Sequence, residues 1–102
     1  MVVYNVTVSI EKSVVEEWKK WMKDEHIPDV LATGLFSSAR FLKMLSEVEG
    51  NPGETYAIQY NCESMDHLTL YQEKYAAVLQ KDHSDRFGGK YHAFRTVLED
   101  VD

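Results

Sequence analysis

Hydrophobic and polar positions alternate along residues 2–10, where every even position is apolar or aromatic and most odd positions are polar. Because successive side chains of a strand point to opposite faces, this alternation predicts a half-buried strand, and its β-branched residues favour that structure. Three further strands are predicted at residues 36–46, 55–62 and 91–99.

The segment after the first strand has the spacing of a helix instead. Val15, Trp18 and Met22 are three and four residues apart, so they lie on one helical face. His26 lies four residues beyond Met22 and is therefore expected to point inward as well. Pro28 lacks a backbone donor and clashes with the preceding turn, so a kink or break is predicted beside this histidine.

End signals delimit two helices. The first is predicted over residues 13–34, opened by a capping box between Ser13 and Glu16 and closed by Gly34 in the left-handed conformation. The second is capped by Ser64 and ends at the glycine pair of residues 88–89. Its apolar stripe is expected to consist of Leu68, Tyr71, Tyr75, Val78 and Leu79. A turn at residues 49–53 separates the second and third strands.

The element order is therefore β-α-β-β-α-β, which predicts a single α+β domain over residues 1–102 with the ferredoxin-like arrangement. Its four antiparallel strands take the order 4-1-3-2, and both helices cover one face. The helix side of the sheet is expected to hold Tyr4, Val6, Val8, Tyr56, Ile58, Tyr60, Phe94 and Leu98. The opposite face is expected to hold Val3, Asn5, Thr7, Arg40, Gln59, Asn61, Tyr91, Arg95 and Val97. This mixed face suits a second copy, so a homodimer through the sheet face, a dimeric α/β barrel, is predicted.

Charge and composition narrow the partners. The formal net charge is −6, from 17 acidic and 11 basic residues, which repels phosphate backbones and anionic lipid. Neither nucleic acid nor a membrane is therefore an expected partner. No segment approaches the ~20 apolar residues of a transmembrane helix, and residues 2–10 lack the basic start of a signal peptide. With Cys62 as the one cysteine, no intramolecular disulfide can form, and a cytoplasmic location is expected.

Four segments together carry a family resemblance: VVYNVTVSI, WKKWMKDEHIPDVLATGLF, TYAIQYNCESM and RFGGKYHAFRTVLE. They resemble the DUF4286 family of small bacterial proteins, which implies a fold and no particular activity. Residues 21–28 are also similar to the aromatic-x-x-x-x-His-x-Pro phrase of EthD-like dimeric α/β barrel proteins. That second resemblance implies relatives among cofactor-free isomerases, cyclases and monooxygenases.

His26 is the candidate for chemistry, because a neutral imidazole in an aromatic pocket can act as a general base or a polar anchor. The alternative is a structural histidine, hydrogen-bonded at a helix kink. The candidate ligand-binding residues are aromatic or flexible side chains expected near the layer between helices and sheet, where they would serve a core equally well. They are Tyr4, Trp18, Met22, Tyr60 and Tyr75.

No metal site and no cofactor are expected. The four histidines are scattered and lack the spacing of metal ligands, and Cys62 has no basic neighbour that would activate its thiol. The glycine pair at residues 88–89 lies at a helix C-terminus, the wrong end for binding an anion.

The leading hypothesis is a cytosolic homodimer that binds a small apolar or aromatic molecule between helices and sheet, or performs cofactor-free acid–base chemistry on it. The alternatives are a non-enzymatic dimeric interaction module and a metabolite-sensing regulatory domain. An open cavity that reaches His26 favours the first hypothesis, whereas close packing around this ring favours an interaction module.

Overall fold

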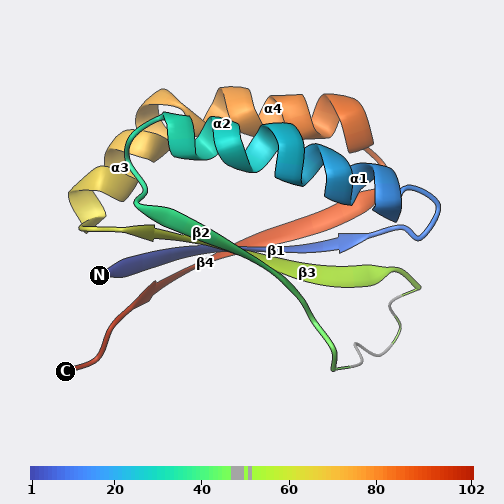
Figure 1. Cartoon of the computed structure of the whole chain (residues 1–102), viewed down its shortest axis with the longest axis horizontal. Coiled ribbons are helices and arrows are strands. Elements are labelled where there is room, and N and C mark those ends of the chain that lie inside the picture. The colour runs from blue at the N-terminus through green and yellow to red at the C-terminus, as the bar shows by residue number, and fades with distance from the viewer. Residues whose placement is uncertain (47–49, 51) are drawn as a thin grey trace.

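Four antiparallel strands form one twisted sheet (Figure 1), and the computed structural model describes residues 1–46, 50 and 52–102. The strands are β1 (Val2–Ile10), β2 (Ser38–Lys43), β3 (Glu54–Cys62) and β4 (Tyr91–Glu99). They lie in the order β2-β3-β1-β4, which is the predicted order read from the opposite edge. β2 is shorter than expected. The predicted turn at residues 49–53 includes Glu49 and Asn51, which lie outside the described residues.

All helical segments lie on one side of this sheet (Figure 1), which confirms the ferredoxin-like α+β architecture. The first predicted helix is a continuous run of α1 (Val15–Trp21), the π-helix η1 (Met22–His26) and α2 (Ile27–Ala32). The second comprises α3 (Met65–Lys74) and α4 (Ala76–Phe87).

The wide turn of η1 is the irregularity predicted beside His26. The Ile27 N–H donates to the Met22 carbonyl, five residues earlier, and Pro28 occupies the start of α2. Because the proline ring clashes with the carbonyl four residues before it, a locally wider turn lets the helix continue. The helix therefore bulges at His26 without breaking.

The predicted capping box is wrong, whereas the other helix ends are as expected. α1 is preceded by Val14, with no side-chain cap, and Ser13 lies instead in a turn in which the Val14 N–H donates to the Glu11 carbonyl. Gly34 has a φ of +79°, the left-handed conformation that glycine adopts freely. Ser64 caps α3 by accepting the His67 backbone N–H.

A break at Tyr75, with φ of −124° and ψ of −31°, divides the second helix and changes its phase. Leu68 and Tyr71 of α3 are buried as predicted. Beyond the break, the predicted stripe is wrong at two positions, because Tyr75 is 39% exposed and Val78 is 72% exposed. α4 instead buries Ala76, His83 and Phe87.

The strand pairing reverses the predicted faces of β4. Val6 of β1 lies opposite Arg95, and directly paired residues share a face of the sheet. Arg95 therefore belongs to the helix side, together with Tyr91 and Val97. Phe94 and Leu98 point away from the helices and are 63% and 45% exposed.

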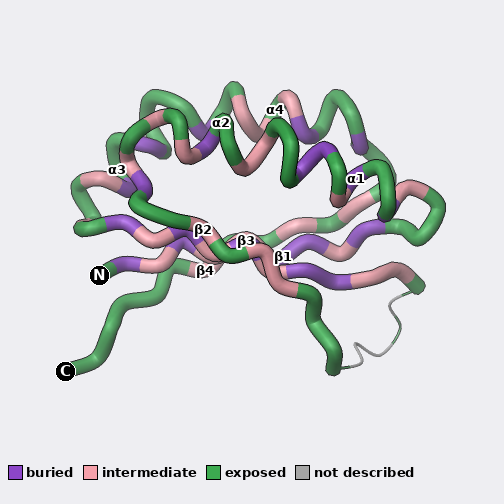
Figure 2. Tube along the Cα trace, in the orientation of Figure 1, coloured by how far each residue is buried: buried purple, intermediate pink, exposed green. Residues whose placement is uncertain are grey.

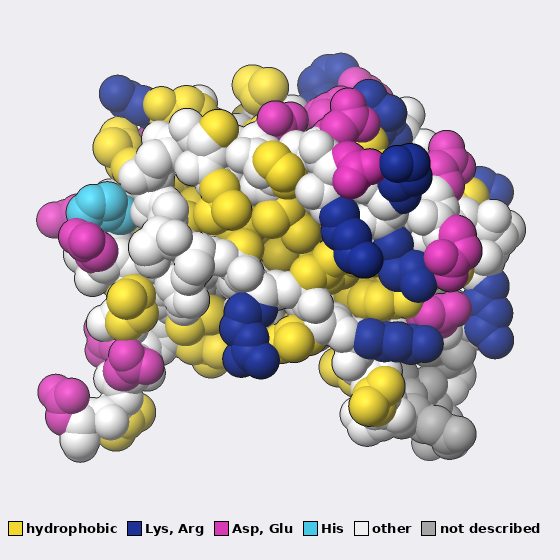
Figure 3. All heavy atoms as spheres, viewed as in Figure 1, with side chains coloured by type: hydrophobic (Ala, Val, Ile, Leu, Met, Phe, Trp, Pro, Cys, Tyr) yellow, Lys and Arg dark blue, Asp and Glu magenta, His cyan; other side chains and the backbone are white. Residues whose placement is uncertain are grey.

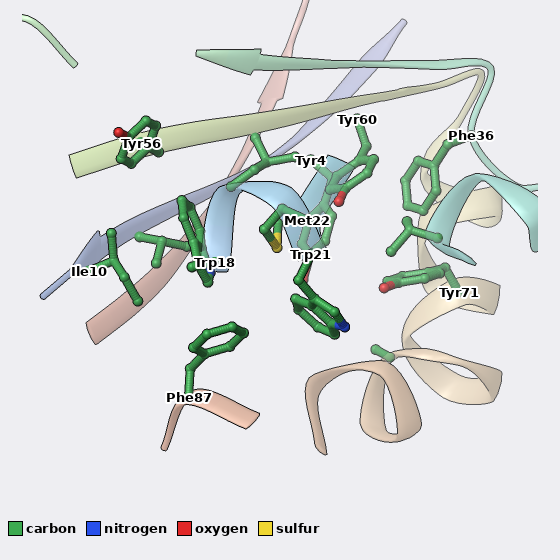
Figure 4. Close-up of a cluster of buried hydrophobic side chains, with 14 of the residues drawn as sticks. Tyr4, Ile10, Trp18, Trp21, Met22, Phe36, Tyr56, Tyr60, Tyr71 and Phe87 are labelled. Carbon is green, nitrogen blue, oxygen red and sulfur yellow. The ribbon is translucent and has the colours of Figure 1, made fainter. Parts of the chain in front are cut away.

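The core lies between the helices and the inner faces of β1 and β3, where buried positions recur along the strands (Figure 2). Trp18 is completely buried, and Figure 4 places it between Ile10 and Met22. In Figure 3, hydrophobic side chains occupy the space between helices and sheet, while charged side chains gather over α1. Among the described residues, no helix is long and apolar enough to cross a membrane.

Candidate functional site

A cavity of about 40 Å³, partly open to solvent, lies between the helix layer and the sheet. It is lined by residues of β1, β3 and β4 below and of η1, α2, α3 and α4 above. Its aliphatic wall includes Val6, which is half-buried for this reason and not fully buried as its strand phase suggests. The polar lining includes the side chains of Tyr60, Tyr71, His26, His83, Gln80 and Arg95.

Of the six candidate residues, the structure brings four together at this cavity. Tyr4, Met22, His26 and Tyr60 all line it. Trp18 does not line the cavity but lies behind it, in contact with His83. Tyr75 is exposed at the break between α3 and α4 and is not part of the lining.

His26 is held at the wide turn of η1 against the ring of Trp21, with the two ring centroids 4.9 Å apart. Its Nδ1 atom is buried and has no hydrogen-bond partner among the described residues. Burial lowers the pKa of this imidazole, and the carboxylates of Asp82 and Asp29 oppose that shift only in part. His26 is therefore a neutral ring with an unused polar atom.

His83 faces the same cavity from α4, with its ring 5.8 Å from that of His26. The indole N–H of Trp18 donates a buried hydrogen bond of 2.9 Å to His83 Nε2. Burial lowers the pKa of His83 to about 4, and the neighbouring His26 and Arg95 act in the same direction. His83 was not among the predicted site residues, although it continues the helical spacing from Leu79, four residues earlier.

Arg95 brings a positive charge to this otherwise neutral cavity. It is more than one-third exposed, and within the described part of the chain it has no ion-pair partner. Its charge contributes to the lowered pKa of both His26 and His83. The alternation of β4 could not reveal this placement, because both of its faces carry aromatic and aliphatic residues.

Tyrosine hydroxyls complete the polar lining. Figure 4 shows the hydroxyls of Tyr60 and Tyr71 directed toward the middle of the side-chain cluster. Burial raises the pKa of both phenols far above the ordinary value, with a smaller contribution from the neighbouring Tyr4. Both hydroxyls therefore remain protonated and can donate hydrogen bonds.

The side chains that line this cavity are suited to bind a polarised oxygen atom of a ligand. One water molecule needs about 10–15 Å³ of such space, so the cavity has room for about three heavy atoms, the size of a carboxylate group. A guanidinium and phenol hydroxyls donate hydrogen bonds, while a neutral imidazole can accept a proton. No group of three or more His, Cys, Asp or Glu residues that could hold a metal occurs in the described part of the chain.

Comparison with known proteins identifies the family of this chain and shows other proteins with the same fold. The family described as "Domain of unknown function (DUF4286)" matches residues 1–101. No curated protein matches the sequence. At3g17210 from Arabidopsis thaliana is similar in structure with a TM-score of 0.74 and 13% identity, covering 100% of this chain and 97% of that protein.

Two further solved structures share the fold over almost their whole length. An EthD family protein from Bacillus halodurans has a TM-score of 0.67 and 10% identity, covering 99% of this chain and 100% of its own. A dimeric ferredoxin-like protein from an uncultured marine organism has a TM-score of 0.66 and 14% identity, covering 100% and 98%. Identities this low show a common fold only.

Proposed function

Because the chain belongs to the DUF4286 family, whose description assigns no activity, we propose a function from the cavity itself: it binds a small molecule through a carboxylate or carbonyl oxygen. The observation that carries this proposal is a pair of uncompensated groups at one cavity. Arg95 has no ion-pair partner and His26 Nδ1 has no hydrogen-bond partner among the described residues.

The buried atom of this pair is costly unless something binds it. A buried polar atom without a partner destabilises a fold by about 1–3 kcal/mol, and a ligand group that bonds to His26 Nδ1 removes that cost. Hydrogen bonds from a guanidinium to a carboxylate are roughly twice as strong as neutral ones. The whole chain carries a net charge of −6 and therefore repels anions on average. The positive charge of Arg95 makes this cavity a favourable place for an anionic group to bind.

The small volume indicates which part of the ligand is held. A carboxylate or carbonyl group fills the space beside His26 and Arg95, while the remainder extends toward solvent along the apolar and aromatic lining, which includes Leu79 and Tyr91. These apolar and aromatic walls suit an aromatic or aliphatic body. The ligand expected from the sequence was a small apolar or aromatic molecule, and the cavity adds that it carries a carboxylate or carbonyl group at one end.

The same groups support proton transfer without a cofactor. His26 can accept a proton from the carbon next to a ligand carbonyl, while Arg95 stabilises the resulting enolate oxygen. Returning that proton from His26 to another ligand atom completes an isomerisation. Binding without turnover would instead indicate the metabolite-sensing role.

We expect Arg95→Gln to weaken the binding of benzoate, a small aromatic carboxylate, by about tenfold or more, since a charged hydrogen bond contributes about 1.5–3 kcal/mol. The measurement is a titration of isotope-labelled protein followed by the NMR signals of His26 and of the cavity backbone.

Arg40→Gln is the matched control, because Arg40 lies opposite Gln59 on the sheet face directed away from the helices. This variant should bind benzoate as the wild type does. Equal affinities for the wild type and both variants would contradict the proposed site.

We also propose that two copies pair through the outer face, meaning the sheet face directed away from the helices. Phe94 and Leu98 expose apolar surface there, and Asn5 Oδ1 is buried without a hydrogen-bond partner among the described residues. The sheet of a second copy would cover Phe94 and Leu98, and it could supply a hydrogen-bond donor to Asn5 Oδ1. The dimeric ferredoxin-like neighbour supports this arrangement.

Phe94→Glu is expected to convert the dimer to a monomer, because it places a charge on the apolar surface that the second copy would cover. Light scattering at micromolar concentration measures the mass. Val78→Glu, at an exposed apolar position of α4, should leave the mass unchanged. A wild-type protein of monomer mass would overturn the proposed dimer.

A further inference from the structure

The hydrogen bond between Trp18 and His83 determines where the proton of His83 resides. An indole nitrogen can only donate, so His83 Nε2, 2.9 Å from Trp18 Nε1, must accept. A neutral imidazole that accepts at Nε2 carries its proton on Nδ1. A doubly protonated ring would instead place two donors face to face.

The donor in this pair is held rigidly. Trp18 has no solvent exposure, and its ring packs against Tyr56 and Phe41, with centroid distances of 5.2 and 5.5 Å. The His83 ring is in turn confined by Tyr91, at 4.3 Å in an edge-to-face arrangement. Neither ring can rotate without repacking the core, so the tautomer is built into the fold.

The other nitrogen of His83 is left for a ligand. Among the described residues, the recorded hydrogen bonds of His83 involve Nε2 and leave Nδ1 without a partner. His83 and Arg95 line the same cavity from opposite layers, α4 above and β4 below. The charged groups that act on His83 are Arg95 and Asp82, with His26 beside them.

We propose that Trp18 is a positioning residue that holds His83 as the neutral Nδ1–H tautomer, and that this N–H and the Arg95 guanidinium together bind the oxygen of the ligand. This inference rests on the proposed function, that the cavity receives such an oxygen. It separates the roles of the two histidines: His83 donates a hydrogen bond to the ligand oxygen, whereas the unpartnered Nδ1 of His26 is the atom available to accept a proton from the neighbouring ligand carbon. The ligand class is consequently a carboxylate, carbonyl or enolate, and an ammonium group is rejected.

The tautomer can be read directly by ¹⁵N NMR of the histidine rings, in which protonated and unprotonated nitrogens have well-separated shifts. In the free wild-type protein, we expect His83 to show a protonated Nδ1 and an unprotonated Nε2. Trp18→Phe removes the donor but keeps an aromatic ring, and should shift His83 toward a mixture of tautomers. Trp21→Phe is the control, because the Trp21 indole N–H has no hydrogen-bond partner among the described residues.

The ligand half of the proposal is tested with two replacements of His83 and benzoate as the probe. The amide of Asn lies near the position of Nδ1, whereas the amide of Gln lies near that of Nε2. His83→Asn should therefore keep benzoate affinity within about threefold of wild type, whereas His83→Gln should lose about tenfold, the value of one hydrogen bond to a charged group. In the wild type, benzoate should also shift the Nδ1 signal.

The outcomes separate the two proposals. Benzoate that moves the His26 and Arg95 signals but not His83 Nδ1 overturns this inference and leaves the proposed function standing. A free protein with its proton on Nε2, or equal loss of affinity in both His83 variants, also overturns it. Benzoate that moves no cavity signal contradicts the proposed function, and the donor role of His83 with it.

Discussion

Ile58→Ala is expected to lower the free energy of unfolding by about 2–5 kcal/mol, the usual range for removing a large aliphatic side chain from a core. Ile58 lies at the centre of β3, is 1% exposed, and pairs with Val6 on one side and Phe41 on the other. Its loss removes transfer free energy and leaves a cavity that the surrounding aromatic rings cannot fill. Equilibrium denaturation in urea, followed by tryptophan fluorescence, measures the change.

Val78→Ala is the control for this experiment, because its side chain is 72% exposed on α4. It should change stability by less than about 0.5 kcal/mol, as surface substitutions do. An equally small effect for Ile58→Ala would mean that the helices do not cover this face of the sheet.

The fold was predictable because most of its elements follow one simple period. In β1 and β3, aromatic and β-branched side chains occupy one face almost without exception, so the inner face could be assigned from alternation alone. β4 lacked that contrast. Phe94 and Leu98 are as apolar as Tyr91 and Val97, so only the pairing with β1 determines which set lies under the helices.

The same ambiguity explains why Arg95 was missed. His26 and Met22 could be placed because the phase of the first helix runs through Val15 and Trp18 without interruption, and Tyr4 and Tyr60 could be placed by their strands. Arg95 required the register of β4. Tyr75 was misplaced because a break in the helix at that residue is not encoded by any glycine or proline.

The predicted N-terminal cap of the first helix did not form because a turn precedes the helix. The Ser13 capping box needs a helix that starts at that residue, but a turn from Glu11 to Val14 delays the start. Ser64 has no such competitor, and its cap forms as expected. Propensity therefore predicted the helix start only where no preceding turn displaces it.

Acid is expected to destabilise the protein between about pH 6.5 and pH 4, mainly through His83. In the folded protein, burial lowers the pKa of His83 to about 4, whereas an unfolded histidine titrates near 6.5. Within this window the unfolded chain binds more protons than the folded one, so stability falls as the pH falls. The full shift corresponds to a loss of roughly 3 kcal/mol, and the lowered pKa of His26 adds to it with the same sign.

Substituting asparagine isolates this contribution from the carboxylates that titrate near pH 4. Because protonation of His83 also breaks the bond donated by Trp18, His83→Asn should flatten the loss of stability between pH 6.5 and pH 4. His92→Asn, at an exposed position of β4, should leave the pH dependence as it is in the wild type. Urea denaturation at several pH values gives the comparison. Parallel curves of stability against pH for all three proteins would show that protonation of His83 does not lower the free energy of unfolding. That result would contradict the hydrogen bond described above, because the Trp18 indole can only donate and lies 2.9 Å from His83 Nε2.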